Sequence, residues 1–260
     1  MSNTISYIPI IDTVREKGQQ LSDFLETTSL QLWKNLNNEV FLIGGGDGFM
    51  IHQIKKTSLQ DGKFISGNKY FWVNCGTLGF LLNDIPFEQI PHNLEDTVEY
   101  KITPLQVTIN ADGKQQTLYA INDIIIGNSV VDYFSFDVEA QDFSRQDIKG
   151  TGLIISSALW SSAYWLNNKG PLMPRDANLV GIMWIATLPF DRKILPNQEL
   201  TIKVSGRKKV NIGVDAIVVE SDPIDEIKIA PSAESFSLLF HKDLDFATKR
   251  ILLAEKKLHN

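Results

Sequence analysis

The spacing of hydrophobic positions changes near Thr97. Before this point, short apolar runs typical of buried strands alternate with segments whose apolar residues recur at helical spacing. The predicted strands are 40–43 and 70–73, and the predicted helices are 12–32, 49–54 and 86–94. Strands that alternate with helices indicate an α/β domain over residues 1–97.

After Thr97, apolar and polar residues alternate, which is the pattern of half-buried strands. Asp112-Gly113 predicts a hairpin turn between two of them. The predicted strands are 98–102, 105–109, 118–126, 133–138, 153–155, 179–186, 200–204, 210–214, 217–219 and 225–229. A short helix at 161–167 and a charged amphipathic helix at about 244–258 complete the pattern. The second part, residues 98–229, is therefore a β-rich domain, and no linker-like segment separates it from the first.

The first predicted strand leads into a glycine-rich bend, Gly44-Gly45-Gly46-Asp47-Gly48, followed by a helix. Backbone N–H groups at such a bend point toward an anion, and glycines let a phosphate approach the main chain. A carboxylate among them would repel a phosphate unless it holds Mg²⁺ or takes a proton from an attacking hydroxyl. The alternative is that Asp47-Gly48 forms a tight left-handed turn that caps the helix.

The second predicted strand leads into a similar bend of small residues, 74–79, which contains Asn74, Gly76 and Gly79. In an open α/β sheet such bends lie side by side at the carboxyl ends of the strands, where ligands bind. The single cysteine, Cys75, lies in this bend without a predicted partner for nucleophilic chemistry, so it is interpreted as a packing residue.

Charge and composition exclude several classes of function. The formal net charge of -6 argues against a nucleic-acid partner, although a local pocket on an acidic protein can still bind an anion. One cysteine excludes a disulfide framework. The histidines are scattered without metal-ligand spacing, so no protein metal site is predicted. No apolar run reaches membrane-spanning length and no signal peptide is present, so a cytoplasmic protein without a membrane partner is expected.

The two bends, in this order, resemble motifs of the NAD kinase family. Gly45-Gly46-Asp47-Gly48 is similar to the family's GGDG loop, which diacylglycerol and sphingosine kinases share. Residues 74–81 are similar to its more specific N-x-G-x-L-G-F-L segment. Asn122-Asp123 stands where the family has an Asn-Glu pair, and residues 150–164 stand where it has G-D-G-L-[IV]-x-S-T-P-T-G-S-T-A-Y. Gly170-Pro171 and Asp215 also match, so the resemblance covers about residues 40–220.

This resemblance implies an NAD kinase-like fold, in which a Rossmann-like N-terminal α/β domain precedes a β-rich domain and a C-terminal segment, 230–260, returns to the first. It implies transfer of a phosphoryl group from ATP, or polyphosphate, to the 2′-hydroxyl of the adenosine ribose of NAD, which gives NADP. Mg²⁺ would accompany ATP, and NAD would be the substrate. A homodimer or homotetramer is expected, since the family is usually oligomeric.

The resemblance also implies roles for individual residues. Asp47 would be the catalytic base and orienting group, and the phosphates would bind at Gly45, Gly46 and Gly48. The dinucleotide would be bound by Asn74, Asn122, Asp123, Thr151, Trp160, Ser162, Ala163 and Tyr164. For Asn122-Asp123 the alternative is a simple hairpin turn.

Three departures from the family pattern bear on function. Thr151 replaces the aspartate of the G-D-G motif and brings no charge. Trp160 replaces a glycine, where it either stacks on an adenine or nicotinamide ring or packs under the helix 161–167. Few residues precede Val40, so the strand–helix–strand unit usual in the family is expected to be reduced. These departures leave two other functions open: a non-catalytic NAD(P)-binding or regulatory homologue, and a superfamily kinase that acts on a lipid or another metabolite.

Overall fold

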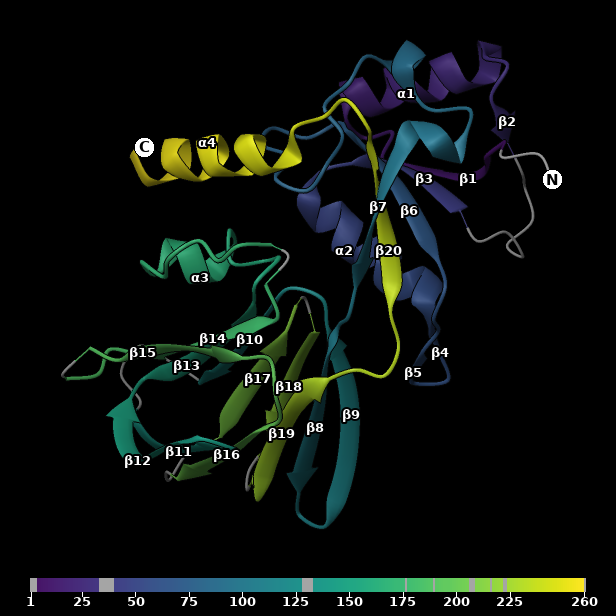
Figure 1. Cartoon of the computed structure of the whole chain (residues 1–260). Helices are drawn as coiled ribbons and strands as arrows, with labels where there is room; N and C mark the ends of the chain where they lie inside the picture. The colour runs from purple at the N-terminus through teal and green to yellow at the C-terminus, as the bar shows by residue number, and fades with distance from the viewer. Residues whose placement is uncertain are drawn as a thin grey trace. The chain divides into compact units, whose positions relative to one another are not determined.

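The structure, a computed structural model, describes residues 4–32, 40–127, 133–175, 177–188, 190–205, 209–215, 217–221 and 224–259. The chain divides into two units (Figure 1). Unit 1 comprises Met1–Thr103 and Glu234–Asn260, and unit 2 comprises Pro104–Ala233. No helix in the described part of the chain is long and apolar enough to cross a membrane.

Unit 1 is built on a six-stranded sheet in which each neighbouring pair is parallel except the last. Its strands in spatial order are β2 (Gln31–Leu32), β1 (Ser6–Ile11), β3 (Val40–Gly45), β6 (Lys69–Asn74), β20 (Phe236–His241) and β7 (Thr97–Ile102). Its helices are α1 (Glu16–Thr27), α2 (Asp47–Ser58) and α4 (Phe246–His259), with short 3₁₀ helices η1 (Phe87–Gln89) and η2 (Leu94–Asp96). A small hairpin, β4 (Leu59–Gln60) and β5 (Lys63–Phe64), follows α2.

Helices α1 and α2 cover opposite faces of this sheet. Leu21 of α1 belongs to the same core cluster as Leu42 of β3. The adjacent position, Phe41, points to the other face, where its ring stacks on Tyr70 at 5.2 Å. The Tyr70 hydroxyl is within 2.7 Å of the Ser58 hydroxyl at the end of α2. Because both faces are covered, these strands are continuous apolar runs, which is the pattern that predicts them from the sequence.

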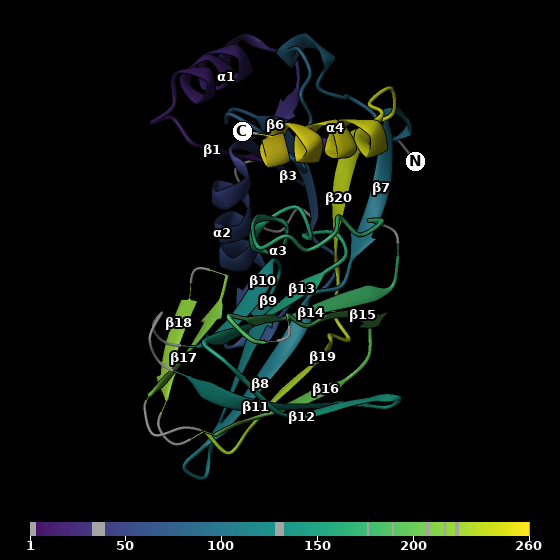
Figure 2. The ribbon, with the colours of Figure 1, turned by 90° about the vertical axis from the view of Figure 1, so that its left-hand side faces the viewer.

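Unit 2 consists of two antiparallel six-stranded sheets. One has the order β15 (Arg192–Pro196), β14 (Leu179–Ile185), β13 (Gly152–Ser157), β10 (Asp123–Gly127), β17 (Val210–Val214) and β18 (Ile217–Ser221). The other has the order β12 (Phe143–Gly150), β11 (Phe134–Ala140), β16 (Leu200–Ser205), β19 (Glu226–Pro231), β8 (Leu105–Ala111) and β9 (Lys114–Ala120). Alternate residues of both sheets form a single core, as in a β-sandwich. The short helix α3 (Tyr164–Asn167) lies over β13 and β14, where Trp165 packs against Ile154 and Met183 (Figure 2).

The predicted α/β part followed by a β-rich part is present, but several elements differ from the sequence pattern. Seven strands are not predicted by it: β1, β2, β4, β5, β12, β15 and β20. The single strand predicted at 118–126 is divided between β9 and β10, which lie in different sheets. Helix α1 ends at Thr27, and Leu32 lies in β2. The predicted helix 86–94 is a single 3₁₀ turn, η1, and the predicted helix 161–167 contains regular helix only in α3. The strand predicted as the first of the β-rich domain is β7, which pairs with β20 in unit 1, because alternation does not tell which sheet a strand joins.

Before Val40 the described residues contain β1, α1 and the two-residue strand β2, so the expected strand–helix–strand unit is present with a short last strand. Strand β1 also pairs in parallel with β3. The pattern hides β1 because Pro9 interrupts its apolar run.

A buried asparagine ties β6 to β20. Asn83 is 0% exposed, and its amide nitrogen donates to the carbonyls of Trp72 (2.9 Å) and Leu239 (3.0 Å). Its side-chain oxygen accepts the N–H of His241 (2.8 Å). One side chain therefore satisfies three buried backbone groups on two strands that are far apart in the sequence.

We expect Asn83→Ala to lower the free energy of unfolding by about 2–4 kcal/mol, because it leaves buried carbonyl and N–H groups without partners. Chemical denaturation of the full chain measures the change. Asn93→Ala, at an exposed position of the same unit, is the matched control and should change stability by less than about 0.5 kcal/mol. An Asn83→Ala protein as stable as the control would contradict this role.

Candidate active site

The two predicted bends lie in contact in unit 1. Strands β3 and β6 are parallel neighbours whose final residues, Gly45 and Asn74, are paired in register. The Cys75 N–H donates to the Gly45 carbonyl at 3.0 Å. A Cβ placed on Gly76 would lie 2.9 Å from the Cα of Gly46. The prediction that the bends lie side by side is confirmed, and glycine is required where they meet.

Asp47 joins the two bends through its carboxylate. Its Oδ2 accepts the N–H of Phe80 (3.2 Å), and its Oδ1 accepts the N–H of Leu81 (3.3 Å). Asp47 and Gly48 both lie in the first turn of α2, and neither has a positive φ, so the alternative of a left-handed capping turn is wrong. The side chain is directed at the second bend rather than at its own helix.

Burial raises the pKa of Asp47. The N–H donors of Leu81 and Phe80 and the positive charge of Lys249 act in the opposite direction. A half-buried carboxylate with a raised pKa is a stronger proton acceptor than an exposed one, provided that it remains ionised at the working pH. The carboxylate oxygens can accept more than one hydrogen bond each, so these amides do not exclude a ligand donor.

Asn74 shapes the second bend from inside. Its Oδ1 accepts the N–H of Gly76 at 2.9 Å. Gly79 has a φ of 65°, and a Cβ there would lie 2.5 Å from the Asn74 amide nitrogen. The spacing of one asparagine and two glycines thus has a local cause: the amide occupies the space that side chains would take at Gly79.

Two cations near these bends are not predicted from the sequence. Arg15, which precedes α1, has its Nη2 3.8 Å from the position of a Cβ on Gly46, while its Nε donates to Asp12 at 3.1 Å. Lys249 of α4 donates to the carbonyl of Leu82 at 2.9 Å. Arg15 follows the unpredicted strand β1, and Lys249 is one of several lysines on an amphipathic helix, so neither stands out in the sequence. Together they provide positive charge around the glycine bend.

In unit 2, a carboxylate holds the Asn122-Asp123 pair in a similar way. Asp215, which has a φ of 55°, accepts the N–H groups of Ile121 (3.0 Å) and Asn122 (2.7 Å). The pair therefore lies in a fixed bend between β9 and β10. The side-chain oxygen Oδ1 of Asn122 and that of Asp123 are buried without a hydrogen-bond partner among the described residues. Buried acceptors of this kind usually have a donor, and a ligand hydroxyl or amide is one group that can supply it.

Asp123 is 4% exposed, and its Oδ2 accepts the N–H of Tyr164 at 2.8 Å. Burial raises the pKa of Asp123 to about 6, Ser156 and the Tyr164 N–H oppose the rise, and the charge of Asp215 adds to it. Ser156 lies opposite Asp123 in β13, but its hydroxyl donates to the Ser157 carbonyl at 3.3 Å. The carboxyl group thus anchors the start of α3.

The other predicted dinucleotide-binding residues separate into two groups. Ser162, Ala163 and Tyr164 adjoin Asp123, because Tyr164 bonds to it directly. Thr151 precedes β13 at the opposite end, since Asp123 pairs with Ser156 and Gly127 pairs with Gly152. Five strand residues correspond to roughly 16 Å, so Thr151 is not brought to the same place within unit 2.

Trp160 is 3% exposed and has no positive φ, so the tryptophan in the place of a family glycine imposes no left-handed backbone. Its indole N–H has no acceptor among the described residues. A ring buried to this degree favours the packing alternative over stacking on a ligand base.

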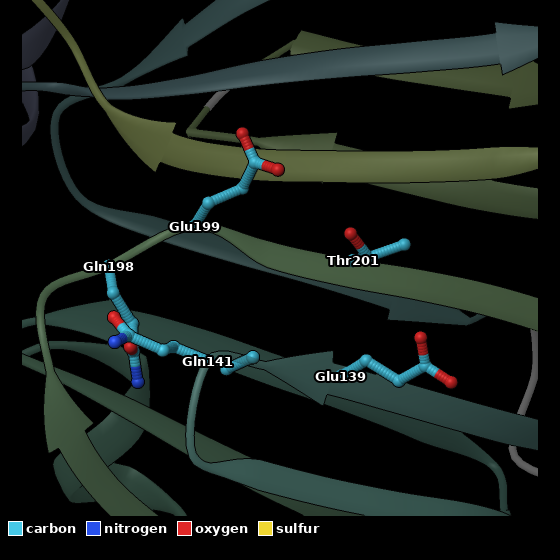
Figure 3. A pocket seen from close by; sticks show the side chains of 6 residues that line it. Glu139, Gln141, Gln198, Glu199 and Thr201 are labelled. Carbon is cyan, nitrogen blue, oxygen red and sulfur yellow. The ribbon is translucent and has the colours of Figure 1, made fainter.

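A separate pocket of about 380 Å³ lies on unit 2 at the ends of β11 and β16 (Figure 3). Its lining residues are Glu139, Ala140, Gln141, Gln198, Glu199 and Thr201. It has two carboxylates and no basic side chain, so it is unsuited to phosphates and is not part of the candidate site.

We expect Gly76→Ala to lower the free energy of unfolding by about 1–3 kcal/mol, because the added Cβ pushes against the Gly46 backbone. Gly48→Ala is the matched control: nothing lies within 4 Å of its Cβ, and alanine favours the helix. Thermal and chemical denaturation of both variants measure the difference. Equal stability of the two variants would contradict the close contact of the bends.

The raised pKa of Asp123 predicts a pH effect on stability. Because the folded state binds this proton more tightly than the unfolded state, protonation of Asp123 stabilises the folded protein. This stabilisation is fully present below the ordinary carboxyl pKa of 3.8 and is lost as the pH rises through about 6. Relative to Asp123→Asn, the unmodified protein should therefore lose about 1 kcal/mol of unfolding free energy between pH 5 and pH 7. Asp142→Asn, at an exposed turn, is the control and should leave the pH dependence of the unmodified protein unchanged.

The chain is similar over most of its length to proteins named NAD kinase. It is 27% identical over 228 residues to that of Rhizobium meliloti (strain 1021), which covers 84% of each chain. It is 24% identical over 236 residues to that of Rickettsia bellii (strain OSU 85-389), which covers 88% of this chain and 90% of the relative. No protein-family model matches the sequence.

Two solved structures share the fold. Yeast NADH kinase complexed with NADH has a TM-score of 0.77 and 16% identity, covering 98% of this chain and 87% of the yeast chain. An NAD kinase from Archaeoglobus fulgidus in complex with ATP has a TM-score of 0.71 and 14% identity, covering 96% of this chain and 98% of that chain. Motif order, fold and relatives agree: the chain is similar to proteins of the NAD kinase family in sequence and in fold.

Proposed function

We propose that this protein transfers a phosphoryl group from ATP, or from polyphosphate, to the 2′-hydroxyl of the adenosine ribose of NAD and so forms NADP. The observation that carries the proposal is the Asp47 carboxylate, held by two amides beside a glycine bend. A ribose hydroxyl is a weak nucleophile at neutral pH, and a carboxylate within hydrogen-bond distance orients it and accepts its proton. Relatives named NAD kinase support this substrate.

The phosphate side would be the glycine bend of unit 1. Amide groups at Gly45, Gly46 and Gly48 would bind phosphate oxygens, helped by the N-terminus of α2 and by the Arg15 guanidinium. Phosphoryl transfer depends mostly on positioning and on neutralisation of charge, which these groups supply.

Mg²⁺ would enter with the phosphates of ATP. No three His, Cys, Asp or Glu side chains of the described residues gather into a metal-ligand set. Mg²⁺ commonly binds through substrate phosphates and water with few protein ligands, so the residues present fit a phosphate-bound ion. When bound, it would neutralise phosphate charge.

The dinucleotide side would include the Asn122-Asp123 bend, whose two unpartnered buried oxygens are suited to accept from ligand hydroxyl or amide groups. Ser162, Ala163 and Tyr164 would extend this surface, and Asn74 would act by shaping the second bend. Thr151 and Trp160 remain weaker candidates for ligand contact. A cytoplasmic homodimer or homotetramer completes the proposal; light scattering on the purified protein tests the oligomer.

The main rival is a non-catalytic NAD(P)-binding homologue, which the substitutions at Thr151 and Trp160 favour. It predicts binding of NAD without turnover. A kinase that acts on a lipid or another metabolite would phosphorylate a different acceptor and leave NAD unchanged.

We expect the unmodified protein to form NADP from NAD, ATP and Mg²⁺, and Asp47→Asn to reduce kcat by about 10²-fold or more, since it removes the proton acceptor. An NADP-specific enzymatic assay measures the rate. Asp61→Asn, on the hairpin after α2, is the matched control and should keep full activity. In Asp47→Asn the side-chain NH2 group would face a backbone N–H that the carboxylate accepts, and this lowers stability. The melting temperatures of the variant and the unmodified protein are therefore compared, to separate a loss of folding from a loss of catalysis. NAD binding without NADP formation in the unmodified protein would favour the rival.

A further inference from the structure

The C-terminal helix α4 contacts the bend 80–82, whose backbone N–H groups also donate to Asp47. Lys249 donates from Nζ to the carbonyl of Leu82 at 2.9 Å. The preceding residue, Leu81, donates its N–H to Asp47 Oδ1 at 3.3 Å. The ammonium of Lys257, further along α4, lies 5.5 Å from the ring centroid of Phe80, whose N–H donates to Asp47 Oδ2. The bend 80–82 is therefore contacted both by Asp47 and by α4.

Three charged side chains act on the Lys249 ammonium: Asp84, Asp47 and Lys17. Burial lowers the pKa of Lys249, and Asp84 and Asp47 raise it, whereas Lys17 lowers it. Asp84 already has an ion-pair partner, since Lys17 Nζ is 3.5 Å from its carboxylate. Lys249 is thus a half-buried cation whose field reaches Asp47, where reduced solvent screening makes a charge more effective than at the surface.

We propose that Lys249 is a positioning residue for Asp47: through the Leu82 carbonyl it holds the bend 80–82 against the carboxylate, and through its positive charge it stabilises the carboxylate as an anion. The proposal rests on the proposed function, because it assigns Asp47 the task of accepting the ribose proton. The Lys249 charge also opposes the effect of burial on the pKa of Asp47, since burial alone favours the protonated carboxyl group, which cannot accept a proton.

Removal of the Lys249 charge is expected to change the pKa of Asp47 in one direction. A nearby cation favours the charged form of a carboxylate, so its loss raises the pKa of Asp47. Activity that needs the unprotonated carboxylate then disappears at a higher pH as the solution is acidified. A merely structural role of Lys249 would lower stability without moving this acid limb.

The test compares Lys249→Met, which removes both the charge and the hydrogen bond, with Lys249→Arg, which keeps both. Lys256→Met, an exposed lysine of the same helix, is the matched control. The rate of NADP formation is measured from pH 5 to pH 9. For Lys249→Met we expect the acid limb to move up by about one pH unit, so that kcat falls about 10-fold on the acid side of the profile. KM for NAD should change by less than about threefold; Lys249→Arg should restore most of the rate, and Lys256→Met should match the unmodified protein.

A second measurement is independent of turnover. Carbon-13 NMR of labelled carboxyl groups gives the titration of Asp47, identified as the signal absent from Asp47→Asn. Lys249→Met should titrate at a higher pH than the unmodified protein, and Lys249→Arg should not. An unchanged titration, or an unmoved acid limb in an active and folded Lys249→Met protein, overturns the proposal and leaves the proposed function intact. If the unmodified protein forms no NADP, the proposed function fails, whereas a shifted titration still supports the link between Lys249 and Asp47.

Discussion

The pairing of a carboxylate with two successive backbone amides is the interaction on which this structure depends. In unit 1, Asp47 accepts the N–H groups of Phe80 and Leu81, so a side chain from the first bend fixes the backbone of the second. Charge-assisted hydrogen bonds of this kind are stronger than bonds between neutral groups. They satisfy amides that would otherwise be costly to bury.

Unit 2 uses the same interaction for a different purpose. Asp215 accepts the N–H groups of Ile121 and Asn122 and so presents the Asn122-Asp123 pair in a fixed bend. The Asp123 carboxyl group in turn anchors the start of α3 through the Tyr164 N–H. The family glutamate is one methylene longer than this aspartate. In this chain the shorter side chain is committed to α3 through one oxygen, while the other oxygen remains unpartnered within the described part of the chain.

The sequence predicts the fold class and the glycine bend well because each has a strong local cause. Two-sided burial makes β3 and β6 continuous apolar runs, and the Asn74, Gly76 and Gly79 spacing follows from one amide that fills one bend. The family resemblance and the adjacency of the two bends are confirmed.

The features that the sequence does not reveal depend on contacts between residues that are far apart in the chain. Lys249 acquires its place only when α4 packs on the bend 80–82. Strand β20 is a short apolar segment whose parallel partner is far back in the chain. For Trp160, no local sequence pattern decides whether the side chain is buried or exposed.

The position of β20 has a consequence for biosynthesis. This strand lies between β6 and β7, yet the ribosome produces it only after all of unit 2. A nascent chain that ends before Glu234 therefore has β6 as an unprotected sheet edge, β7 without a neighbour and the bend 80–82 without its lysine. Exposed strand edges pair readily with other chains. Completion of unit 1 thus waits for β20 and α4 to be synthesised, and a chain that ends before Glu234 is expected to aggregate through its exposed strand edges.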